Sequence, residues 1–480
     1  MLFNSIEFLI FLPITFSLYW LATNKRILFQ NALLLVFSYF FYASWNWKFL
    51  FLLIFSTLLD YFTGLKIAAA PTHYTKKVWL CLSIFINLGL LVVLKYYNFL
   101  LSIFTQIGDL TDLTIHATSL QIILPIGISF YTFHGLSYII DIYNNKINPE
   151  KKFINYALYV SFFPLLVAGP IERATHLLPQ IIKKRAFDKT KMLEGLQQIL
   201  WGFFKKVVIA DQCATIVNPI FQHYSSYSGS MLVLGAVLFT FQIYGDFSGY
   251  SDIALGVAKL FGIELMQNFA FPLFSRNTAE FWRRWHISLT SWFRDYLYIP
   301  LGGNSGGIWL KIRNIVIIFF VSGLWHGANY TFIVYGLLNA LYVIPSIVLN
   351  KSKNMANIVA QTRNLPTLHE GFQMLRTFGL AAFALIIFRS PNLTSAYGYM
   401  AKMFDTSLFT LPMLNSELFV LLFFLMVFMI LEWLGRRNQY AIATITNDWS
   451  GITKLLFYFG LIFPIINFSE SPQEFIYFQF

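Results

Sequence analysis

The chain has 480 residues, of which 57% are hydrophobic and only 12% are charged. Because a soluble domain carries about 25% charged residues, this composition excludes a soluble globular enzyme. Apolar runs long enough to cross a hydrocarbon core of about 30 Å recur from one end of the sequence to the other. The net charge of +12 then indicates contact with lipid head groups rather than with nucleic acid. The sequence predicts an all-α polytopic membrane protein.

The first apolar run is MLFNSIEFLIFLPITFSLYW. It lacks a basic leader region and a small-residue cleavage site, so we predict a retained span rather than a signal peptide. The two cysteines, Cys81 and Cys213, lie far apart and outside any metal-binding spacing. We therefore predict neither a disulfide framework nor a metal site.

Basic loops predict the orientation of the chain, because short loops rich in Lys and Arg stay in the cytoplasm. Such residues follow the first run at 25–26 and the third run at 66–77, whereas the loop 106–119 contains no Lys or Arg. We expect the N-terminus outside and a fifth span, Leu120–Tyr143, that returns the chain to the cytoplasmic side. Basic stretches on both sides of FFPLLVAGP (162–170) predict a re-entrant or interfacial element there, since Pro and Gly break the helix.

The second half of the chain contains a long basic stretch, 259–313, that is too polar to cross and is predicted to be a cytoplasmic-side amphipathic segment. The apolar run 314–349 has basic residues at both ends, so we predict a hairpin whose turn lies deep in the membrane. No internal repeat is visible, and we expect a single membrane-embedded domain over 1–480. Further predicted crossings, which put the C-terminus outside, are 193–210, 231–258, 372–388, 418–434 and 455–466.

His326 is the clearest chemical candidate. It follows Arg313 by about 13 residues, which is roughly 20 Å along a helix, and a polar side chain at that depth is costly unless it has a function. Gly323 and Gly327 remove side-chain bulk beside the ring, so that a substrate or another helix can approach. A helix-packing motif with a structural histidine is the alternative interpretation.

The second candidate is the segment from Ala279 to Asn304, which contains His286. Its aromatic residues recur at helical spacing, so we predict an amphipathic helix at the inner interface with His286 on its flank. An anchoring helix explains most of the segment, but leaves the histidine unexplained. The residues that define the predicted apolar face are Phe281, Trp285, Leu289, Trp292 and Tyr296.

Two acids, Asp246 and Asp252, lie near the cytoplasmic end of an apolar span, where they can orient a histidine or bind a cation. Polar contacts between helices are an equally good interpretation. A structural role is favoured for His134, which also lies within an apolar run. The sequence contains no metalloprotease, nucleotide-binding or serine-hydrolase motif.

Seven segments, in order along nearly the whole chain, resemble the membrane-bound O-acyltransferase family, in its branch of alginate O-acetyltransferase membrane subunits and D-alanyl transfer proteins. They are FNSIEFLIFLPI, LPIGISFYTFHGLSYIIDIY, VAGPIER, QIYGDFSGYSDIALG, FWRRWHISLTSWFRDYLYIPLGGN, SGLWHGANYTFIVYG and FIYFQF.

The resemblance implies a ring of about 11 to 13 membrane helices, re-entrant elements included, around a central tunnel. It also implies that His326 is the catalytic histidine and His286 the second histidine of the site. We expect further contacts to substrate or donor from residues near these histidines or near the cytoplasmic rim: Trp282, Arg283, Arg284, Trp285, Trp325, Asn329 and Asp246.

Acyl transfer from a thioester to a hydroxyl requires a base, stabilisation of the oxyanion and exclusion of water. We expect His326 to be the general base or a transient acyl carrier, and His286, at the cytoplasmic rim, to orient the donor or partner. The expected donor is acetyl coenzyme A or an acyl carrier thioester, without a tightly bound cofactor.

The predicted function is O-acetylation of a cell-surface polysaccharide such as alginate, from the bacterial inner membrane. The resemblance implies a separate periplasmic acetyltransferase as partner and no contact with nucleic acid. Peptidoglycan is an alternative acceptor. D-alanyl transfer to teichoic acid is a further candidate function, and a transporter or flippase for a lipid-linked sugar is the candidate outside enzymes.

Overall fold

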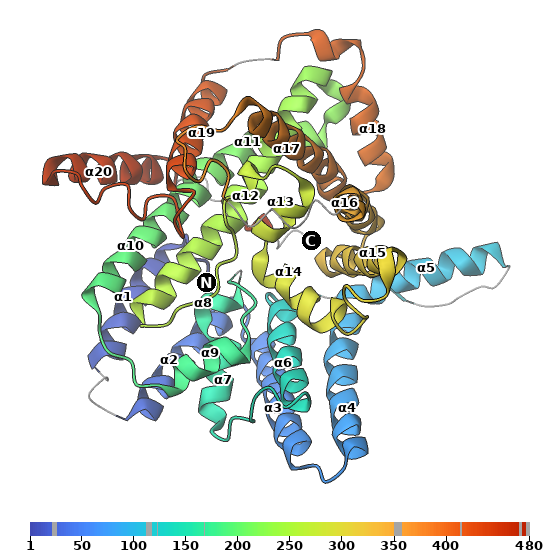
Figure 1. Cartoon of the computed structure of the whole chain (residues 1–480), viewed down its shortest axis with the longest axis vertical. Helices are drawn as coiled ribbons and strands as arrows, with labels where there is room; N and C mark the ends of the chain where they lie inside the picture. Colours follow the sequence, from blue (N-terminus) through green and yellow to red (C-terminus); the bar gives the residue numbers. More distant parts are fainter. Residues whose placement is uncertain are drawn as a thin grey trace. The chain divides into compact units, whose positions relative to one another are not determined.

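The computed structural model describes residues 1–21, 26–111, 118–121, 123–167, 169–349, 358–412, 415–469 and 473–476. Every regular element in these ranges is a helix (Figure 1). Among them, 8 helical segments are long and apolar enough to cross a membrane. Two more helices, α1 (Ile6–Leu21) and α2 (Ile27–Ala43), are apolar but shorter. The predicted all-α polytopic membrane protein is confirmed.

The chain divides into two compact units, and each is described by itself. Unit 1 comprises residues 1–192 and 257–266. After α1 and α2, its elements in chain order are α3 (Trp47–Ala69), α4 (His73–Leu91), the π-helical turn η1 (Val92–Tyr96), α5 (Tyr97–Leu110), α6 (Ile128–Tyr143), α7 (Phe153–Ser161), α8 (Phe163–Leu166) and α9 (Ala174–Ile182).

Helix α6 packs against α3 and α4 in unit 1 through a small buried polar cluster. The carboxylate of Asp60 on α3 accepts hydrogen bonds from Ser83 Oγ (2.8 Å) and Asn87 Nδ2 (2.7 Å) on α4. Gly135 on α6 lies directly against the same carboxylate, where a side chain would collide with it. Hydrogen bonds and a small residue therefore hold these three helices together, as is usual where the surroundings are apolar.

The predicted fifth span, Leu120–Tyr143, begins too early. The helix begins at Ile128, after Gly127 in a left-handed conformation with φ of 77°. Pro125 and Gly127 explain the late start, because neither residue favours the interior of a helix. The segment 162–170, predicted to be re-entrant, contains the short helix α8, and its described residues are buried.

Unit 2 comprises residues 193–256 and 267–480. It contains most of α10 (Lys189–Phe203) and of α12 (Gly229–Leu260). Its other elements are η2 (Phe204–Ala210), α11 (Asp211–Gln222), η3 (Tyr224–Ser226), η4 (Pro272–Phe274), α13 (Thr278–Arg284), α14 (Ile287–Phe293), η5 (Arg294–Tyr298), α15 (Gly307–His326), α16 (Tyr330–Val348), α17 (Leu368–Arg389), α18 (Leu393–Met403), η7 (Thr406–Phe409), α19 (Ser416–Gly435) and α20 (Gly451–Phe468).

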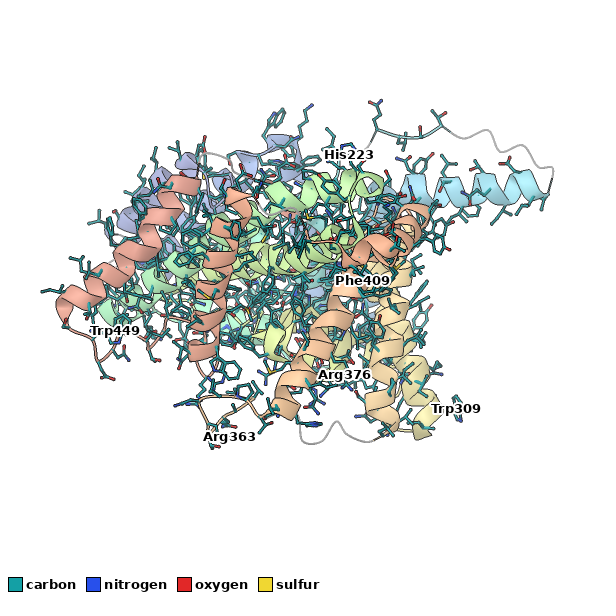
Figure 2. The ribbon with its side chains drawn as sticks, turned by 90° about the horizontal axis from the view of Figure 1, so that it is seen from above. His223, Trp309, Arg363, Arg376, Phe409 and Trp449 are labelled. Atoms are coloured by element: carbon teal, nitrogen blue, oxygen red, sulfur yellow. The ribbon has the colours of Figure 1, made fainter. Side chains whose placement is uncertain are left out.

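Helices α15 and α16 form a helical hairpin within the run 314–349. Gly323 on α15 lies against the backbone carbonyl of Phe332, and Gly336 on α16 lies against that of Phe319. Each glycine therefore lets one helix touch the backbone of the other, as in membrane helix pairs with small residues at their crossing. Figure 2 shows Trp309, near the start of α15, on the opposite side of unit 2 from His223.

The predicted crossing 193–210 is not one of the eight apolar segments. It consists of α10 and the π-helical turn η2, which contains the buried residues Lys205 and Lys206. A π-helical turn inserts an extra residue into the helix and is often found near functional sites. Here it places both lysines against acids of α11 and α12.

Gly336→Ala should destabilise the protein by about 1 to 3 kcal/mol, because the added methyl group collides with a backbone carbonyl that cannot rotate away. Gly379→Ala is the matched control, since that helix position has open space around it and alanine favours a helix over glycine. The melting temperature in detergent, followed by size-exclusion chromatography with fluorescence detection, should fall for the first variant only. Equal melting temperatures would contradict the close crossing of α15 and α16.

Candidate active site

The predicted amphipathic helix over 279–304 is interrupted at His286. Helix α13 ends at Arg284, and His286 adopts a left-handed conformation with φ of 44°, which is uncommon for a residue with a side chain. Two backbone hydrogen bonds of 2.9 Å, from Ala270 N to Arg284 O and from Ile287 N to Asn268 O, replace the helical pattern. The prediction of one continuous helix is therefore wrong, because the chain segment 268–270 pairs with the break.

This break turns the side chain of His286 into the protein. The residue is 1% exposed, so it does not lie on the flank of an interfacial helix. Its ring packs edge-on against Phe247, with 4.6 Å between centroids, and lies 5.8 Å from the ring of Trp325. His286 lies outside the eight candidate spans. Burial lowers the pKa of its imidazole well below the usual range, and the nearby imidazole of His326 lowers this pKa further.

His326 is the last residue of α15 and lies at the turn of the hairpin. It is 7% exposed, and its ring centroid is 5.2 Å from Trp325, 5.2 Å from Phe388 and 6.2 Å from Tyr335. Trp325 thus contacts both histidines. The two histidines singled out from the sequence, 40 positions apart, lie in one aromatic cluster of unit 2.

Asn268 was missed by the sequence analysis. Its Oδ1 atom is 2.9 Å from His286 Nδ1, and its Nδ2 atom donates to Ser251 Oγ at 3.2 Å. Asn268 lies in an irregular connection, so neither periodicity nor a motif pointed to it. Only the pairing between segment 268–270 and the break at His286 brings the two side chains together.

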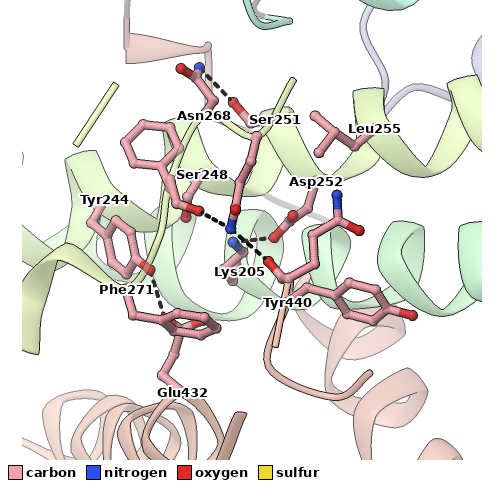
Figure 3. Close-up of a pocket in the computed structure, with 13 residues that line it drawn as sticks. Lys205, Tyr244, Ser248, Ser251, Asp252, Leu255, Asn268, Phe271, Glu432 and Tyr440 are labelled. Atoms are coloured by element: carbon pink, nitrogen blue, oxygen red, sulfur yellow. Dashed lines mark hydrogen bonds and ion pairs between the residues drawn. The ribbon is translucent and has the colours of Figure 1, made fainter. Parts of the chain in front are cut away.

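A narrow pocket of about 310 Å³, open mouth included, reaches Asn268 from the side of α12 and α19. Figure 3 shows that Asn268 and Ser251 border this pocket. The ion pair of Lys205 with Asp252 and the hydrogen-bonded pair of Tyr244 with Glu432 also line it. Its lining residues are Lys205, Tyr244, Ser248, Ser251, Asp252, Leu255, Gln267, Asn268, Phe269, Phe271, Glu432, Gln439 and Tyr440.

The expected role of Arg284 in binding an anionic donor has no support, because its guanidinium is bound within the protein. Its Nε and NH2 atoms donate to Glu280 Oε1 at 3.1 and 3.0 Å, and its NH1 atom donates to Ala270 O at 3.2 Å. Glu280 also pairs with Arg276. The neighbouring Arg283 is exposed.

The two tryptophans predicted in and just after α13 pack against other aromatic rings. Trp285 is buried and stacks on Phe281, with centroids 5.4 Å apart. Trp282 lies edge-on against Phe319 of α15 at 5.2 Å. Asn329 caps α16: its Oδ1 atom accepts from Thr331 N at 3.1 Å, and its Nδ2 atom donates to Pro391 O at 2.8 Å.

Asp246 and Asp252 are each paired with a buried lysine, which leaves neither acid beside a histidine. Lys206 Nζ is 2.8 Å from Asp246 Oδ1, and Lys205 Nζ is 2.5 Å from Asp252 Oδ2. Asp246 also accepts a hydrogen bond from Ile476 N at 2.6 Å. Both acids are buried or nearly so, and a buried charge requires such a partner. Each acid therefore binds a lysine of η2.

The chain is similar to several known proteins and to one family model. Residues 146–372 match the model of the membrane-bound O-acyltransferase family. The chain is 36% identical to a probable alginate O-acetylase of Pseudomonas putida over 100% of both chains. It is 38% identical to the corresponding protein of Pseudomonas aeruginosa over 86% of this chain and 77% of the relative.

A peptidoglycan O-acetyltransferase of Helicobacter pylori is also similar, at 33% identity over 100% of this chain and 98% of the relative. These similarities extend over the helices of both units, and the family match includes the break at His286 and the hairpin that carries His326. The chain belongs to the membrane-bound O-acyltransferase family.

Proposed function

We propose that this O-acetyltransferase takes an acetyl group from a cytoplasmic thioester and passes it to a hydroxyl acceptor on the outer side of the membrane. The observation that carries the proposal is the meeting of His286 and His326 around Trp325. Two imidazoles in a buried aromatic cluster provide proton acceptors where little water competes. A purely structural role does not require two such histidines in one cluster.

In the proposed reaction, His326 takes the proton of the attacking hydroxyl while its oxygen adds to the thioester carbonyl. The carbon–sulfur bond then breaks, and the thiolate leaves with the proton held by the imidazole, so that atoms and charge balance. His286 orients the reacting groups, with its Nε2 atom as a hydrogen-bond acceptor. The surrounding rings of Trp325, Phe388 and Tyr335 exclude the water that would otherwise hydrolyse the thioester.

The acetyl donor is proposed to be acetyl coenzyme A or an acyl carrier thioester, which share the reacting thioester group. The acceptor is proposed to be a cell-surface polysaccharide, because the similar Pseudomonas proteins are named alginate O-acetylases. A peptidoglycan acceptor is the second candidate, because the similar protein of Helicobacter pylori carries that name. A partner protein outside the membrane is proposed to complete the transfer to the polymer.

The proposed location is the bacterial inner membrane, with both termini outside. The basic loops support this orientation, and so does unit 2 itself. Trp309 lies in the stretch 259–313, which is predicted to be cytoplasmic, and Arg363 follows the basic end of the run 314–349. Both residues lie on the side opposite His223 in Figure 2. His223 lies in the connection predicted to be outside.

His326→Ala should lower acetylation of the surface polysaccharide by about 100-fold or more, which is the usual contribution of a general base. His369→Ala is the matched control, because His369 is an exposed residue of α17 whose ring contacts Gln373. Mass spectrometry of surface glycans measures the ester, and immunoblotting confirms that each variant accumulates in membranes. Normal acetylation in His326→Ala would contradict an enzymatic role and favour a transporter; loss of alanyl rather than acetyl esters would identify D-alanyl transfer.

If His326 acts as a base, it should not carry the acetyl group itself. We expect the peptide that contains His326 to keep its unmodified mass after purified protein meets an acetyl thioester without acceptor and is quenched rapidly. The His326→Ala protein, treated in the same way, gives the background. An acetyl group on the His326 peptide at a level comparable to the enzyme concentration would show a transient carrier instead.

A further inference from the structure

We infer that Asn268 is the positioning residue of this site and that its side-chain amide fixes which nitrogen of His286 carries the proton. Neither the sequence motifs nor the similarities assign any role to Asn268. The inference rests on the proposed function, since it gives His286 a part in acyl transfer. Its physical content, the tautomer of one buried imidazole, can nevertheless be measured without any activity assay.

The orientation of the Asn268 amide follows from its partners. Three groups converge on its Oδ1 atom: His286 Nδ1 at 2.9 Å, Ser288 Oγ at 2.9 Å and the backbone nitrogen of Ser288 at 3.4 Å. A backbone N–H can only donate, so the atom that it meets must be the amide oxygen. On the other side, the Nδ2 atom donates to Ser251 Oγ at 3.2 Å. The reversed amide would place NH2 hydrogens against a backbone N–H.

The tautomer of His286 follows from the amide. An amide oxygen only accepts hydrogen bonds, so the His286 nitrogen that faces it, Nδ1, carries the hydrogen. In the neutral ring the lone pair then lies on Nε2. This Nε2 atom is buried and has no hydrogen-bond partner among the described residues. A buried acceptor without a partner is costly, and such an atom is expected where a substrate group completes the hydrogen bond.

The position of the ring is fixed together with its tautomer. Phe247 meets the imidazole edge-on at 4.6 Å, and Asn268 is itself anchored twice, because its backbone oxygen accepts from Ile287 N at 2.9 Å. The left-handed backbone of His286 costs free energy, and such strain persists where the surrounding structure holds the residue in place. Asn268, Ser251 and Ser288 come from three different segments, and together they direct Nε2 away from Asn268.

His134, a buried histidine of unit 1, shows a contrasting arrangement. Its Nε2 atom accepts a hydrogen bond from the backbone nitrogen of Glu172 at 3.1 Å, so the ring holds a loop. Its lone pair is therefore already occupied by the protein. His286 differs because Asn268 bonds to its protonated Nδ1 atom. The unprotonated Nε2 atom is therefore left for a ligand. His134 is thus a natural internal reference.

The direct test is nitrogen-15 NMR of the full-length protein in detergent or lipid, with labelled histidine. The chain has 8 histidines, and the spectrum of His286→Gln identifies the signals of His286 by difference. We expect a protonated Nδ1 and an unprotonated Nε2 in the wild-type protein. The opposite tautomer in the wild-type protein would overturn the inference, and this result does not depend on any variant of Asn268 folding.

The variants separate positioning from packing. Asn268→Leu removes the hydrogen-bond acceptor at similar side-chain volume. The Nδ1-protonated form of His286 should then no longer dominate. Acetyl transfer should slow by at least about 10-fold, as expected when a catalytic imidazole loses its orienting acceptor. Asn268→Asp keeps an oxygen toward Nδ1, and it should preserve the tautomer and recover part of the rate.

Asn314→Leu is the matched control, because Asn314 is also a buried asparagine of unit 2 but bonds to backbone carbonyls. It should leave the signals of both His286 and His134 unchanged. An unchanged tautomer and rate in Asn268→Leu would overturn the inference. If instead the tautomer changes as expected while His286→Gln still transfers acetyl groups normally, the positioning by Asn268 holds and the catalytic role proposed for His286 fails.

Discussion

The site depends on the pairing of segment 268–270 with the break between α13 and α14. Two backbone hydrogen bonds, at Ala270 and Ile287, replace helical ones and allow His286 to adopt a left-handed conformation. The pairing interrupts the continuous helix that the aromatic spacing of this segment favours. With the pairing, the His286 ring enters the aromatic cluster around Trp325, where His326 arrives from the end of α15.

Ion pairs among the buried charges of unit 2 support this arrangement. Lys205 pairs with Asp252, Lys206 with Asp246, and Glu280 with two arginines of its own segment. Removing one partner of such a pair leaves an uncompensated buried charge, which costs about 3 to 5 kcal/mol. These pairs hold helices and loops in place, while the neighbourhood of the histidines consists largely of aromatic rings. The separation leaves the imidazoles as the reactive groups of the cluster.

The sequence predicted the hairpin of α15 and α16, because basic residues at both ends of one long apolar run allow few other arrangements. In the structure, His326 is the last residue of its first helix. The sequence could not predict the break at His286, since the aromatic spacing from Phe281 to Tyr296 fits one helix throughout, and the competing interaction comes from residues 268–270. No local sequence pattern marked Asn268 either, because its contact with His286 also depends on this pairing.

Further differences between prediction and structure were visible in the sequence. Glu280 lies four residues before Arg284, a spacing that favours an ion pair on a helix, and this pair accounts for the guanidinium that was expected to bind a donor. Pro125 and Gly127 likewise marked the late start of α6. The ion pair of Asp246 with Lys206 is visible only in the three-dimensional structure, because the two residues are 40 positions apart and lie on different helices.

The central claim is that His286 and His326 act as one unit, and a double-mutant cycle tests it most directly. Acetyl-transfer rates of the wild-type protein, His286→Ala, His326→Ala and the double variant are compared at equal protein amounts in membranes. Residues that act together in one step show strongly non-additive losses, so the double variant should be about as slow as the slower single variant. Losses that multiply would contradict the account, because they would show two histidines that act independently.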